Sequence, residues 1–532
     1  MQDVRHIVVL MLENRSFFNL LGDMRGVRGG LHDPRSLRPL RYSNRDAQGR
    51  AYACTPVNAE TLCSSSTFPN DHAATRASVR GGGAGFVRAF ERSFEALRHT
   101  LPDDGVQERN LVERCDQKGV WLGEPLTYFP FGSLPAIHGL ARHFAVCDAW
   151  HASVPSATWP NRLFAMSGTS HGLTSMPMSP GDFRAAQLLQ QNQETVFHLL
   201  QRARVSTKIY YHDAPLTLLA QRNWDPAVLA LHHRMDAFFE DARPERWRTR
   251  FPQVAWIEPR YTGAANDFHP PHNPRNGDHL VGAVYNALRA NRALWKHTLL
   301  VVTFDEHGGF FDPVKPPRVD ARVLAQLKSA AERQQCFRRY GVRVPTLLVS
   351  PRLRRFGVID STLYDHTSLL KALCVRFALD PAPLGPRTCA ANDFWHLFGA
   401  PADAQERRQL RACPASVALE PYDETVRSGQ AGFWNSFQCE MVQTLSCTLD
   451  LYAGACERVA ALKTLLPHSS AAFDFFTRFN REVRKLAHKP REQDNTHADD
   501  KDGQDDQDDH DNAAEAEAAA DSAGWRSRCV IS

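Results

Sequence analysis

Apolar and β-branched residues gather in short runs along the first 350 residues, and turn residues bound each run. Runs of this length and composition predict buried strands. Between them, the stretches Gly277–Trp295 and Ser361–Ala378 have helical spacing. Alternating strands and helices predict an α/β fold, with a doubly wound, mostly parallel sheet flanked by helices. The predicted strands are His6–Leu12, Phe144–Asp148, Lys208–Tyr211, Val254–Glu258, Leu299–Phe304 and Pro345–Ser350.

The pattern changes twice along the 532 residues. Residues 1–380 carry the alternation of strands and helices and are predicted to form the main domain. Residues 381–490 are predicted to be a mainly helical extension without recognisable chemistry. Residues 491–532 are polar, acidic and of low complexity, which predicts a disordered tail. The glycine-rich segment Arg80–Gly85 predicts a loop, and it lacks the Lys-Ser/Thr ending of a phosphate-binding loop.

The net charge of +4 conceals an uneven distribution. Between Glu492 and Asp521 there are 13 acidic residues and one basic residue, so the rest of the chain carries +16. A basic body suits anionic ligands such as phosphates or lipid headgroups, although scattered arginines are also common on solvated surfaces. The charge therefore favours a phosphate-type ligand, and no motif indicates a nucleic-acid partner.

No membrane span is predicted, because the longest apolar runs fall far short of the ~20 residues that a membrane helix requires. The first residues have neither the long apolar core nor the small-residue cleavage site of a secretory signal. We therefore expect a cytosolic protein whose 12 cysteines, which form no C-x-x-C pair, are reduced. Nothing in the sequence predicts its oligomeric state.

Two predicted strands end in a pair of oxygen-bearing side chains: Glu13-Asn14 after the first strand, and Asp305-Glu306 later. Because parallel strands present their carboxyl ends at one edge of the sheet, the four side chains are expected to converge on a cation. The alternative is that Asn14 or Ser16 caps the next helix and the acids are solvated. Two such pairs together favour the metal site.

A third element is the segment from Pro155 to Arg162, in which Pro160 fits the first turn of a helix. Thr158 would then lie just before the helix N-terminus, beside unpaired N–H groups and the positive end of the helix dipole. A hydroxyl there can attack phosphorus, while N–H groups and Arg162 hold the phosphoryl oxygens. A bound cation would have to lower the pKa of the hydroxyl, so this role depends on the acids. Otherwise Thr158 belongs only to a capping turn.

Several histidines fall near strand ends or in loops and are candidates for holding phosphate oxygens or donating a proton to a leaving group. A single histidine is more often a surface residue or a hydrogen-bonded core residue. The clusters around His269 and His366 are stronger candidates than isolated ones. The candidates are His72, His212, His269, His272, His307 and His366.

Together these segments resemble the motif series of the phosphoesterase family, which contains non-specific phospholipases C and related acid phosphatases within the alkaline phosphatase superfamily. The resemblance runs in order from residue 5 to about 380 and makes residues 1–380 the expected catalytic domain. One departure is Phe18, which stands where the family has Asp, so a supporting hydrogen bond is expected to be absent. The motifs are Glu13-Asn-Arg-Ser-Phe, Thr158-x-Pro-Asn-Arg162, Asn266-Asp-x-His269-Pro, Thr303-x-Asp-Glu-His-Gly-Gly-Phe-x-Asp312 and Tyr364-Asp-His366-Thr-Ser.

The resemblance also implies the roles of individual residues. Thr158 would be both the nucleophile and a metal ligand, and His212 and His269 would line the phosphate. The other metal ligands would be Glu13, Asn14, Asp305 and Glu306, and the further substrate-binding candidates are Asn161, Arg162, His72, His272, His307 and His366. The cation is Zn²⁺ by family resemblance, whereas all-oxygen ligands favour Ca²⁺ or Mg²⁺.

The expected activity is that of a phospholipase C, which splits glycerophospholipids at a membrane surface into diacylglycerol and a phosphorylated headgroup. Thr158 would form a phosphothreonine intermediate and His269 would protonate the leaving alkoxide. The alternatives are an acid phosphatase acting on phosphomonoesters and a non-catalytic phosphate- or lipid-binding protein. The apolar segment Trp121–Phe131 is either the approach for a lipid or a buried loop.

The chain ends in Cys529-Val-Ile-Ser, which has the form of a C-a-a-X box for farnesylation. Cys529 is therefore a lipidation candidate in a eukaryotic cytosol. One lipid anchors only marginally, so the basic body would have to supply the second attraction to the bilayer.

Overall fold

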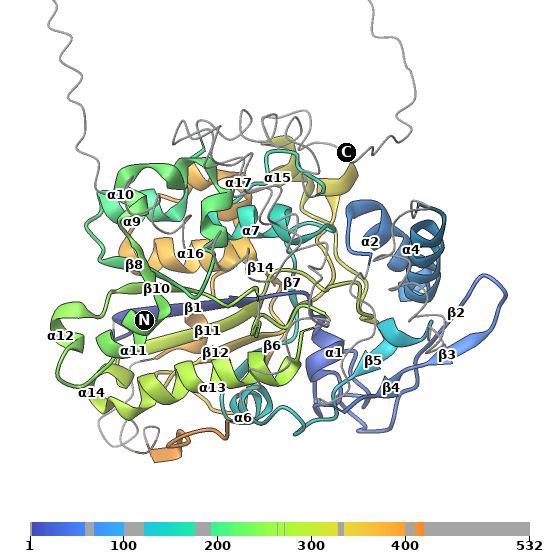
Figure 1. Cartoon of the computed structure of the whole chain (residues 1–532), viewed down its shortest axis with the longest axis horizontal. Coiled ribbons are helices and arrows are strands. Elements are labelled where there is room, and N and C mark those ends of the chain that lie inside the picture. The colour runs from blue at the N-terminus through green and yellow to red at the C-terminus, as the bar shows by residue number, and fades with distance from the viewer. Residues whose placement is uncertain are drawn as a thin grey trace, which may run out of the picture. The chain divides into compact units, whose positions relative to one another are not determined.

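The computed structural model of the chain describes residues 3–58, 69–100, 122–175, 193–262, 264–270, 272–327, 335–399, 408 and 411–419. Its centre is an eight-stranded sheet with the order β13-β6-β12-β11-β1-β10-β8-β9 (Figure 1). Within this sheet β12 runs antiparallel to both neighbours, and every other pairing is parallel. The predicted fold class is thus confirmed. The strands are β1 (His6–Leu12), β6 (Ala145–Cys147), β8 (Thr207–Tyr211), β9 (His232–Arg234), β10 (Val254–Glu258), β11 (Thr298–Phe304), β12 (Thr346–Val349) and β13 (Ile359–Asp360).

The six predicted strands are all present, and each end lies within one residue of its predicted position. Every residue of β1 and β11 is buried, because helices cover both faces of the sheet. This explains why these two strands are continuously apolar rather than alternating. The two strands pair in parallel, with Leu12 opposite Phe304, so the residues that follow them emerge side by side.

Helices form a layer on each face of the sheet (Figure 1). One layer contains α6 (Pro135–His143), α13 (Pro274–Ala290) and α14 (Arg292–Trp295). The other contains α7 (Thr158–Ser167), α9 (Val196–Arg202), α16 (His366–Phe377) and α17 (Gly385–Ala390). Further short helices are α10 (Pro226–Leu229), α11 (Met235–Asp241), α12 (Trp247–Arg250) and α15 (Ala321–Ala325).

The two predicted helices differ from the observed ones at their ends. The stretch Gly277–Trp295 is divided, because Asn291 leaves the helical conformation and its side chain caps the second helix. The stretch Ser361–Ala378 becomes helical only at His366, since Asp365 accepts the backbone N–H of Ser368 in a capping box. The preceding residues form β14 (Tyr364–Asp365), which pairs with β7 (Trp150–His151).

A smaller group of elements lies at the end of the molecule where β1 leads into α1 (Phe17–Leu21) (Figure 1). The triple-glycine segment predicted as a loop is a kinked one-turn helix, α3 (Arg80–Gly83), in which Gly81 and Gly82 are left-handed. The other elements are the hairpin of β2 (Ser43–Arg45) and β3 (Ala51–Ala53), the pair β4 (Thr55–Pro56) and β5 (Thr127–Tyr128), and the helices α2 (His72–Ser78) and α4 (Phe86–Thr100).

Described residues beyond position 380 pack against this domain. Phe394 and Trp395 belong to the main hydrophobic core. The guanidinium of Arg387 donates to Ser153 O and to Asp365 Oδ2, at 3.0 and 2.6 Å. Further along, Tyr285 donates its hydroxyl to Pro414 O at 2.6 Å.

Some predictions fall outside the described residues, including the tail from 491 and Cys529. Trp121 lies outside as well, but residues 122–131 mostly pack inside, with Leu126 and Phe129 buried. Of the two readings of that segment, a buried loop is therefore the one observed for its described part. Within the described ranges, no helix is both long and apolar enough to span a membrane.

Candidate active site

The two pairs of oxygen-bearing residues meet at the carboxyl edge of the sheet, as their positions after β1 and β11 require. The backbone N–H of Asn14 donates to Asp305 Oδ1 at 3.1 Å, and the N–H of Asp305 donates to Leu12 O at 3.0 Å. Glu13 and Asp305 are completely buried. The structure thus places these acids close together, as their positions at the ends of two apolar strands predict.

The backbone at this junction is unusual. Asn14 is left-handed, with φ of 55°, and Gly308 opposite has φ of 61°. A Cβ atom on Gly308 would lie 2.2 Å from Asn14 O, so only glycine permits this close approach. Asparagine tolerates the left-handed region better than most residues, and the conformation aims its side chain at the site.

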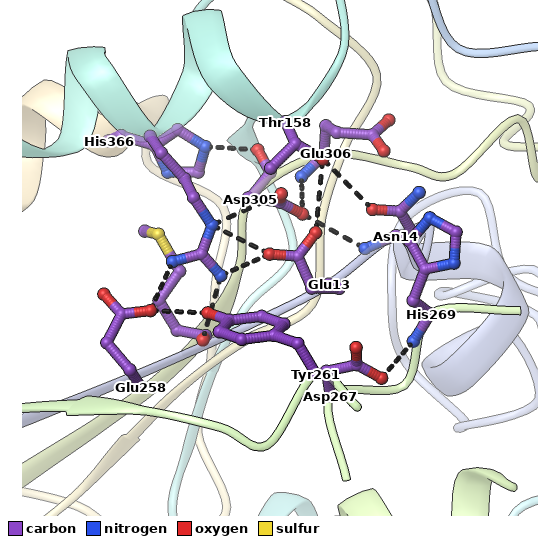
Figure 2. Close-up of polar contacts among 12 residues, drawn as sticks. Glu13, Asn14, Thr158, Glu258, Tyr261, Asp267, His269, Asp305, Glu306 and His366 are labelled. Carbon is purple, nitrogen blue, oxygen red and sulfur yellow. Dashed lines mark hydrogen bonds and ion pairs between the residues drawn. The ribbon is translucent and has the colours of Figure 1, made fainter. Parts of the chain in front are cut away.

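Thr158 is the first residue of α7, and its side chain does not cap the helix. Its Oγ1 lies 3.2 Å from Glu13 Oε2 and 3.5 Å from Asn14 Oδ1 (Figure 2). The Thr158 residue is only 2% exposed. A hydroxyl from the start of α7 therefore meets a carboxylate and an amide oxygen from the two residues that follow β1.

Arg162 lies one turn further along α7, and its guanidinium contacts buried acidic side chains. Its Nη2 lies 2.5 Å from Glu13 Oε1, and its Nη1 lies 3.0 Å from Glu258 Oε2. Its Nε lies 3.7 Å from Asp305 Oδ2. Sequence reasoning assigned this guanidinium to phosphoryl oxygens, but the structure places it among the buried carboxylates (Figure 2).

Glu258 was not among the predicted site residues. It is the last residue of β10, the strand beside β1, and it accepts hydrogen bonds from Trp256 Nε1 at 2.9 Å and Tyr261 Oη at 2.5 Å. The signal that identified the other acids, a carboxylate at the end of an apolar strand, was also present here. Asn161, by contrast, holds the loop before the helix: its amide contacts backbone groups of Val154, Ser156 and Ala157.

The electrostatics of the site follow from burial. Desolvation raises the pKa of Glu13 well above its ordinary value, the neighbouring Asp305 raises it further, and Arg162 opposes both. Burial also raises the pKa of Glu258, again against the effect of Arg162. One guanidinium is shared among three carboxylates, so the site has an excess of acidic groups that a bound cation would balance.

Glu306 follows the same strand but is directed elsewhere. Its Oε1 accepts Asn70 Nδ2 at 2.8 Å, and its Oε2 accepts the N–H of Gly308 at 2.8 Å and lies 3.1 Å from His307 Nδ1. Burial raises its pKa, and His307 lowers it. Asn70, which carried no signal in the sequence, thus ties the loop before α2 to this acid.

Two of the predicted histidines hold the backbone of the site. His366 Nε2 lies 2.6 Å from Asp305 O, and its Nδ1 accepts Trp150 Nε1 at 3.5 Å. His72 Nδ1 lies 2.9 Å from Pro155 O, in the loop that leads to Thr158. Both therefore support the positions of catalytic candidates.

The remaining histidines lie in two loops. His272 Nδ1 lies 2.6 Å from Asp267 Oδ1, and the N–H of His269 donates to the same oxygen at 3.0 Å. Asp267 O in turn accepts the N–H of Glu13, which places this loop beside the first acid. His212 follows β8, and its buried Nε2 has no hydrogen-bond partner in the described structure. Burial lowers the pKa of His212 and of His269 to about 3.

The donor set is compatible with a divalent cation. Glu13, Asn14 and Thr158 bring three oxygens together, and Asp305 Oδ2 is buried without a hydrogen bond. Among the described residues, no group of three or more His, Cys, Asp or Glu side chains is placed to hold a metal. The hydroxyl and the amide oxygen would therefore have to complete the set, and such oxygen ligands suit hard cations.

Phe18, which stands where the resembled family has Asp, lies in α1 and packs against the segment after β11. The Phe18 ring packs against Phe311 with ring centroids 5.1 Å apart, and its N–H donates to Asp312 Oδ2 at 3.2 Å. Asp312 also pairs with the buried Arg343 at 3.0 Å. The carboxylate of Asp312 thus ties the segment after β11 to α1.

A mostly parallel sheet whose carboxyl edge joins a buried hydroxyl to acids suits a phosphoric ester hydrolase. The chain belongs to the phosphoesterase family, which matches residues 4–380. The family is generally metal-dependent.

Several characterised proteins are similar to this chain. Non-specific phospholipase C6 of Arabidopsis thaliana is 32% identical over 409 residues, which cover 74% of this chain and 71% of that protein. Non-specific phospholipase C3 of the same plant is 30% identical, and the match covers 92% of this chain and 91% of that protein. Hemolytic phospholipase C of Pseudomonas aeruginosa is 28% identical over 78% of this chain and 59% of its own length.

Among solved structures, a protein in the alkaline phosphatase superfamily from Vibrio parahaemolyticus is 12% identical. The alignment covers 52% of this chain and 67% of that one. The TM-score is 0.30.

Proposed function

We propose that this protein is a phospholipase C, which hydrolyses glycerophospholipids to diacylglycerol and a phosphorylated headgroup. The observation that carries the proposal is the Thr158 hydroxyl, buried at the start of α7 and 3.2 Å from Glu13 Oε2. The substrate class rests on the relatives, several of which are non-specific phospholipases C.

Thr158 Oγ1 attacks the phosphorus, and the ester bond to the diacylglycerol oxygen breaks in line with the attack. Glu13 Oε2 is within hydrogen-bond distance to accept the hydroxyl proton. The resulting phosphothreonine is then hydrolysed by water, which releases the phosphorylated headgroup and regenerates the hydroxyl. Two displacements at phosphorus thus replace one direct attack by water.

The cation would be held by Glu13, Asn14, Thr158 and Asp305. When bound, it supplies positive charge that lowers the pKa of the hydroxyl and stabilises the phosphoryl oxygens. Glu306 is a further ligand only if its carboxylate leaves Asn70 and the Gly308 N–H. The shared guanidinium of Arg162 leaves the carboxylates partly unneutralised, as a cation site requires.

The leaving alkoxide needs a proton, and the loop of His269 and His272 lies beside the acids. We assign this role to His272 rather than to His269. Asp267 Oδ1 lies 2.6 Å from His272 Nδ1 and so orients the His272 ring. The His269 ring is held by the Pro270 carbonyl instead.

An acid phosphatase would use the same residues on phosphomonoesters, so substrate assays have to separate the two activities. The purified chain should release phosphocholine from dispersed phosphatidylcholine much faster than phosphate from p-nitrophenyl phosphate, and a chelator should abolish both reactions. A preference for the monoester would overturn the phospholipase assignment. No turnover of either substrate, with retained binding of phosphate, would indicate a non-catalytic binding protein.

A further inference from the structure

The segment from Arg25 to Arg50, which contains β2 and the loop before it, is strongly basic. It carries seven arginines and two aspartates. All seven arginines are exposed, and none forms a salt bridge with another described residue. The arginines are Arg25, Arg28, Arg35, Arg38, Arg41, Arg45 and Arg50.

One of the two negative charges of the segment is buried, and the other is held within the turn before β2. Asp46 is buried and accepts the backbone N–H of Arg50 at 2.7 Å and the Tyr52 hydroxyl at 3.1 Å. Asp33 accepts the N–H groups of Arg35 and Ser36, which lowers its pKa. The surface therefore carries seven exposed arginines against one accessible carboxylate, that of Asp33.

The alternation of β2 directs its charges outwards. Tyr42 and Asn44 face the protein: Asn44 Nδ2 donates to Gly83 O, and its Oδ1 accepts the N–H of Phe86. Arg45 lies on the other face of the strand, where its Nη1 donates to Gly49 O in the hairpin turn at 2.6 Å, and Arg41 precedes the strand. Both are exposed.

At the turn before β2, an apolar side chain is presented beside these charges. Leu37 is 49% exposed and lies between Arg35 and Arg38. Its φ of 56° is rare and strained for a leucine. Hydrogen bonds from Leu37 N to Asp33 O and from Asp33 N to Arg38 O hold the turn in this form. An exposed leucine in a fixed turn flanked by arginines suits insertion at a charged bilayer surface.

The segment is anchored near the site. The Tyr42 ring lies 5.6 Å from Phe18 and 5.7 Å from Phe311, and Phe86 packs 6.1 Å from the His307 ring. Figure 1 shows the β2–β3 hairpin at the end of the molecule where β1 leads into α1. The basic face and the catalytic edge thus share one end of the domain.

We propose that residues 25–50 form a docking surface for anionic bilayers, with the arginines contacting lipid phosphates and Leu37 entering the headgroup layer. Each arginine near an anionic surface contributes about fivefold to the partition coefficient. The proposal concerns binding, so it goes beyond the catalytic role of Thr158.

The test compares two variants that lose the same charge. One carries Arg35→Gln, Arg38→Gln and Arg41→Gln, and the control carries Arg248→Gln, Arg250→Gln and Arg292→Gln, from α12 and α14 at the opposite end of the domain (Figure 1). Both are made in the full chain with Thr158→Ala, so that no lipid is consumed. Binding is measured by co-sedimentation with phosphatidylcholine vesicles that contain or lack phosphatidylserine.

The first variant should bind the phosphatidylserine vesicles about 100-fold more weakly, at about fivefold for each of the three arginines, while the control stays within about twofold of the parent. Leu37→Asn should also weaken binding, although asparagine relaxes the strained turn and should leave Tm unchanged or raised. Added salt should weaken binding by the parent chain. Equal losses in the two triple variants would overturn the proposal. The proposal would also be overturned if the parent chain bound duplex DNA but not vesicles, and if the first triple variant lost that DNA binding.

Failure of the proposed activity would look different. With Thr158 restored, the first triple variant should hydrolyse a monomeric short-chain phosphatidylcholine at the parental rate. If no variant hydrolyses it but vesicle binding still depends on residues 25–50, the docking surface stands and the phospholipase assignment fails.

Discussion

Arg162 holds Glu13 and Glu258 on opposite sides of one guanidinium, with Nη2 2.5 Å from Glu13 Oε1 and Nη1 3.0 Å from Glu258 Oε2. The two carboxylates therefore share the single positive charge of the guanidinium. Removing the charge of Glu258 would leave Arg162 free to neutralise Glu13 more completely, at the expense of a cation competing for the same oxygens.

Glu258→Gln should therefore weaken binding of a divalent cation by at least about tenfold, a loss of about 1.4 kcal/mol. Isothermal titration with Zn²⁺, Ca²⁺ and Mg²⁺ measures this directly. Tyr261→Phe is the matched control, because it removes a hydrogen bond to Glu258 but keeps the charge. It should lower stability by about 1 kcal/mol and change cation affinity little. Equal effects of both variants on cation affinity would rule out the charge argument.

Thr158→Ala should lower kcat by at least about 10³-fold, because it removes the attacking oxygen. Thr158→Ser retains a hydroxyl and should keep a measurable fraction of the rate. Circular dichroism should show both variants folded, since only a small side chain changes. An alanine variant with a tenth of the parental rate would exclude the covalent mechanism.

Glu13→Gln and Asp305→Asn should each reduce metal content as well as rate, since an amide binds cations more weakly than a carboxylate does. Elemental analysis after desalting gives the metal per chain. Glu245→Gln, which removes the same charge from an exposed residue outside the site, provides a control. Unchanged stoichiometry and affinity in both acid variants would remove these residues from the metal site.

Gly308→Ala should impair activity through Asn14. The new Cβ would lie 2.2 Å from Asn14 O and would also strain a left-handed residue, so we expect a stability loss of about 1–3 kcal/mol. Gly132→Ala is the control: Gly132 has φ of 111° but open space where a Cβ would be. The Gly132 variant should lose stability but keep kcat. The Gly308 variant should lose stability, measured by urea unfolding, and also kcat, measured by activity assays.

Stability should depend on pH through His138. Burial lowers its pKa to about 4; its Nδ1 accepts the N–H groups of Gly132 and Leu134, and its Nε2 contacts Leu20 O. The unfolded chain, with an ordinary pKa near 6.5, binds the extra proton first as pH falls. Between pH 7 and pH 5 this histidine should cost about 2 kcal/mol of unfolding free energy. In urea titrations, His138→Asn should flatten the pH dependence by that amount; an unchanged slope would contradict the assignment.

The sequence predicted the parts of the site that depend on position along a strand. Glu13 and Asp305 follow continuously apolar runs, and parallel strands deliver such residues to one edge. Glu258 was missed as a partner of Arg162, because its place in the site depends on β10 lying beside β1. The apolar run Val254–Glu258 does not itself indicate which strand is its neighbour. The same end-of-strand criterion would nevertheless have marked Glu258.

Other features depend on contacts between distant segments. Asn70 meets Glu306 across 236 positions, and nothing around it in the sequence marks that contact. The start of α16 was placed too early because apolar spacing continues through Ser361, whereas the Asp365 cap decides where the helix begins. Local pattern thus gives the elements, and side-chain capping sets their limits.

The packing beyond position 380 bears on how a shorter fragment should be cut. The family match stops at residue 380, but a chain ending there would lack Phe394 and Trp395 and leave their core neighbours facing water. It would also lack Arg387, the buried cation that pairs with Asp365 directly before His366. A soluble fragment for crystallisation or binding studies should therefore extend at least through residue 399, and preferably through residue 419.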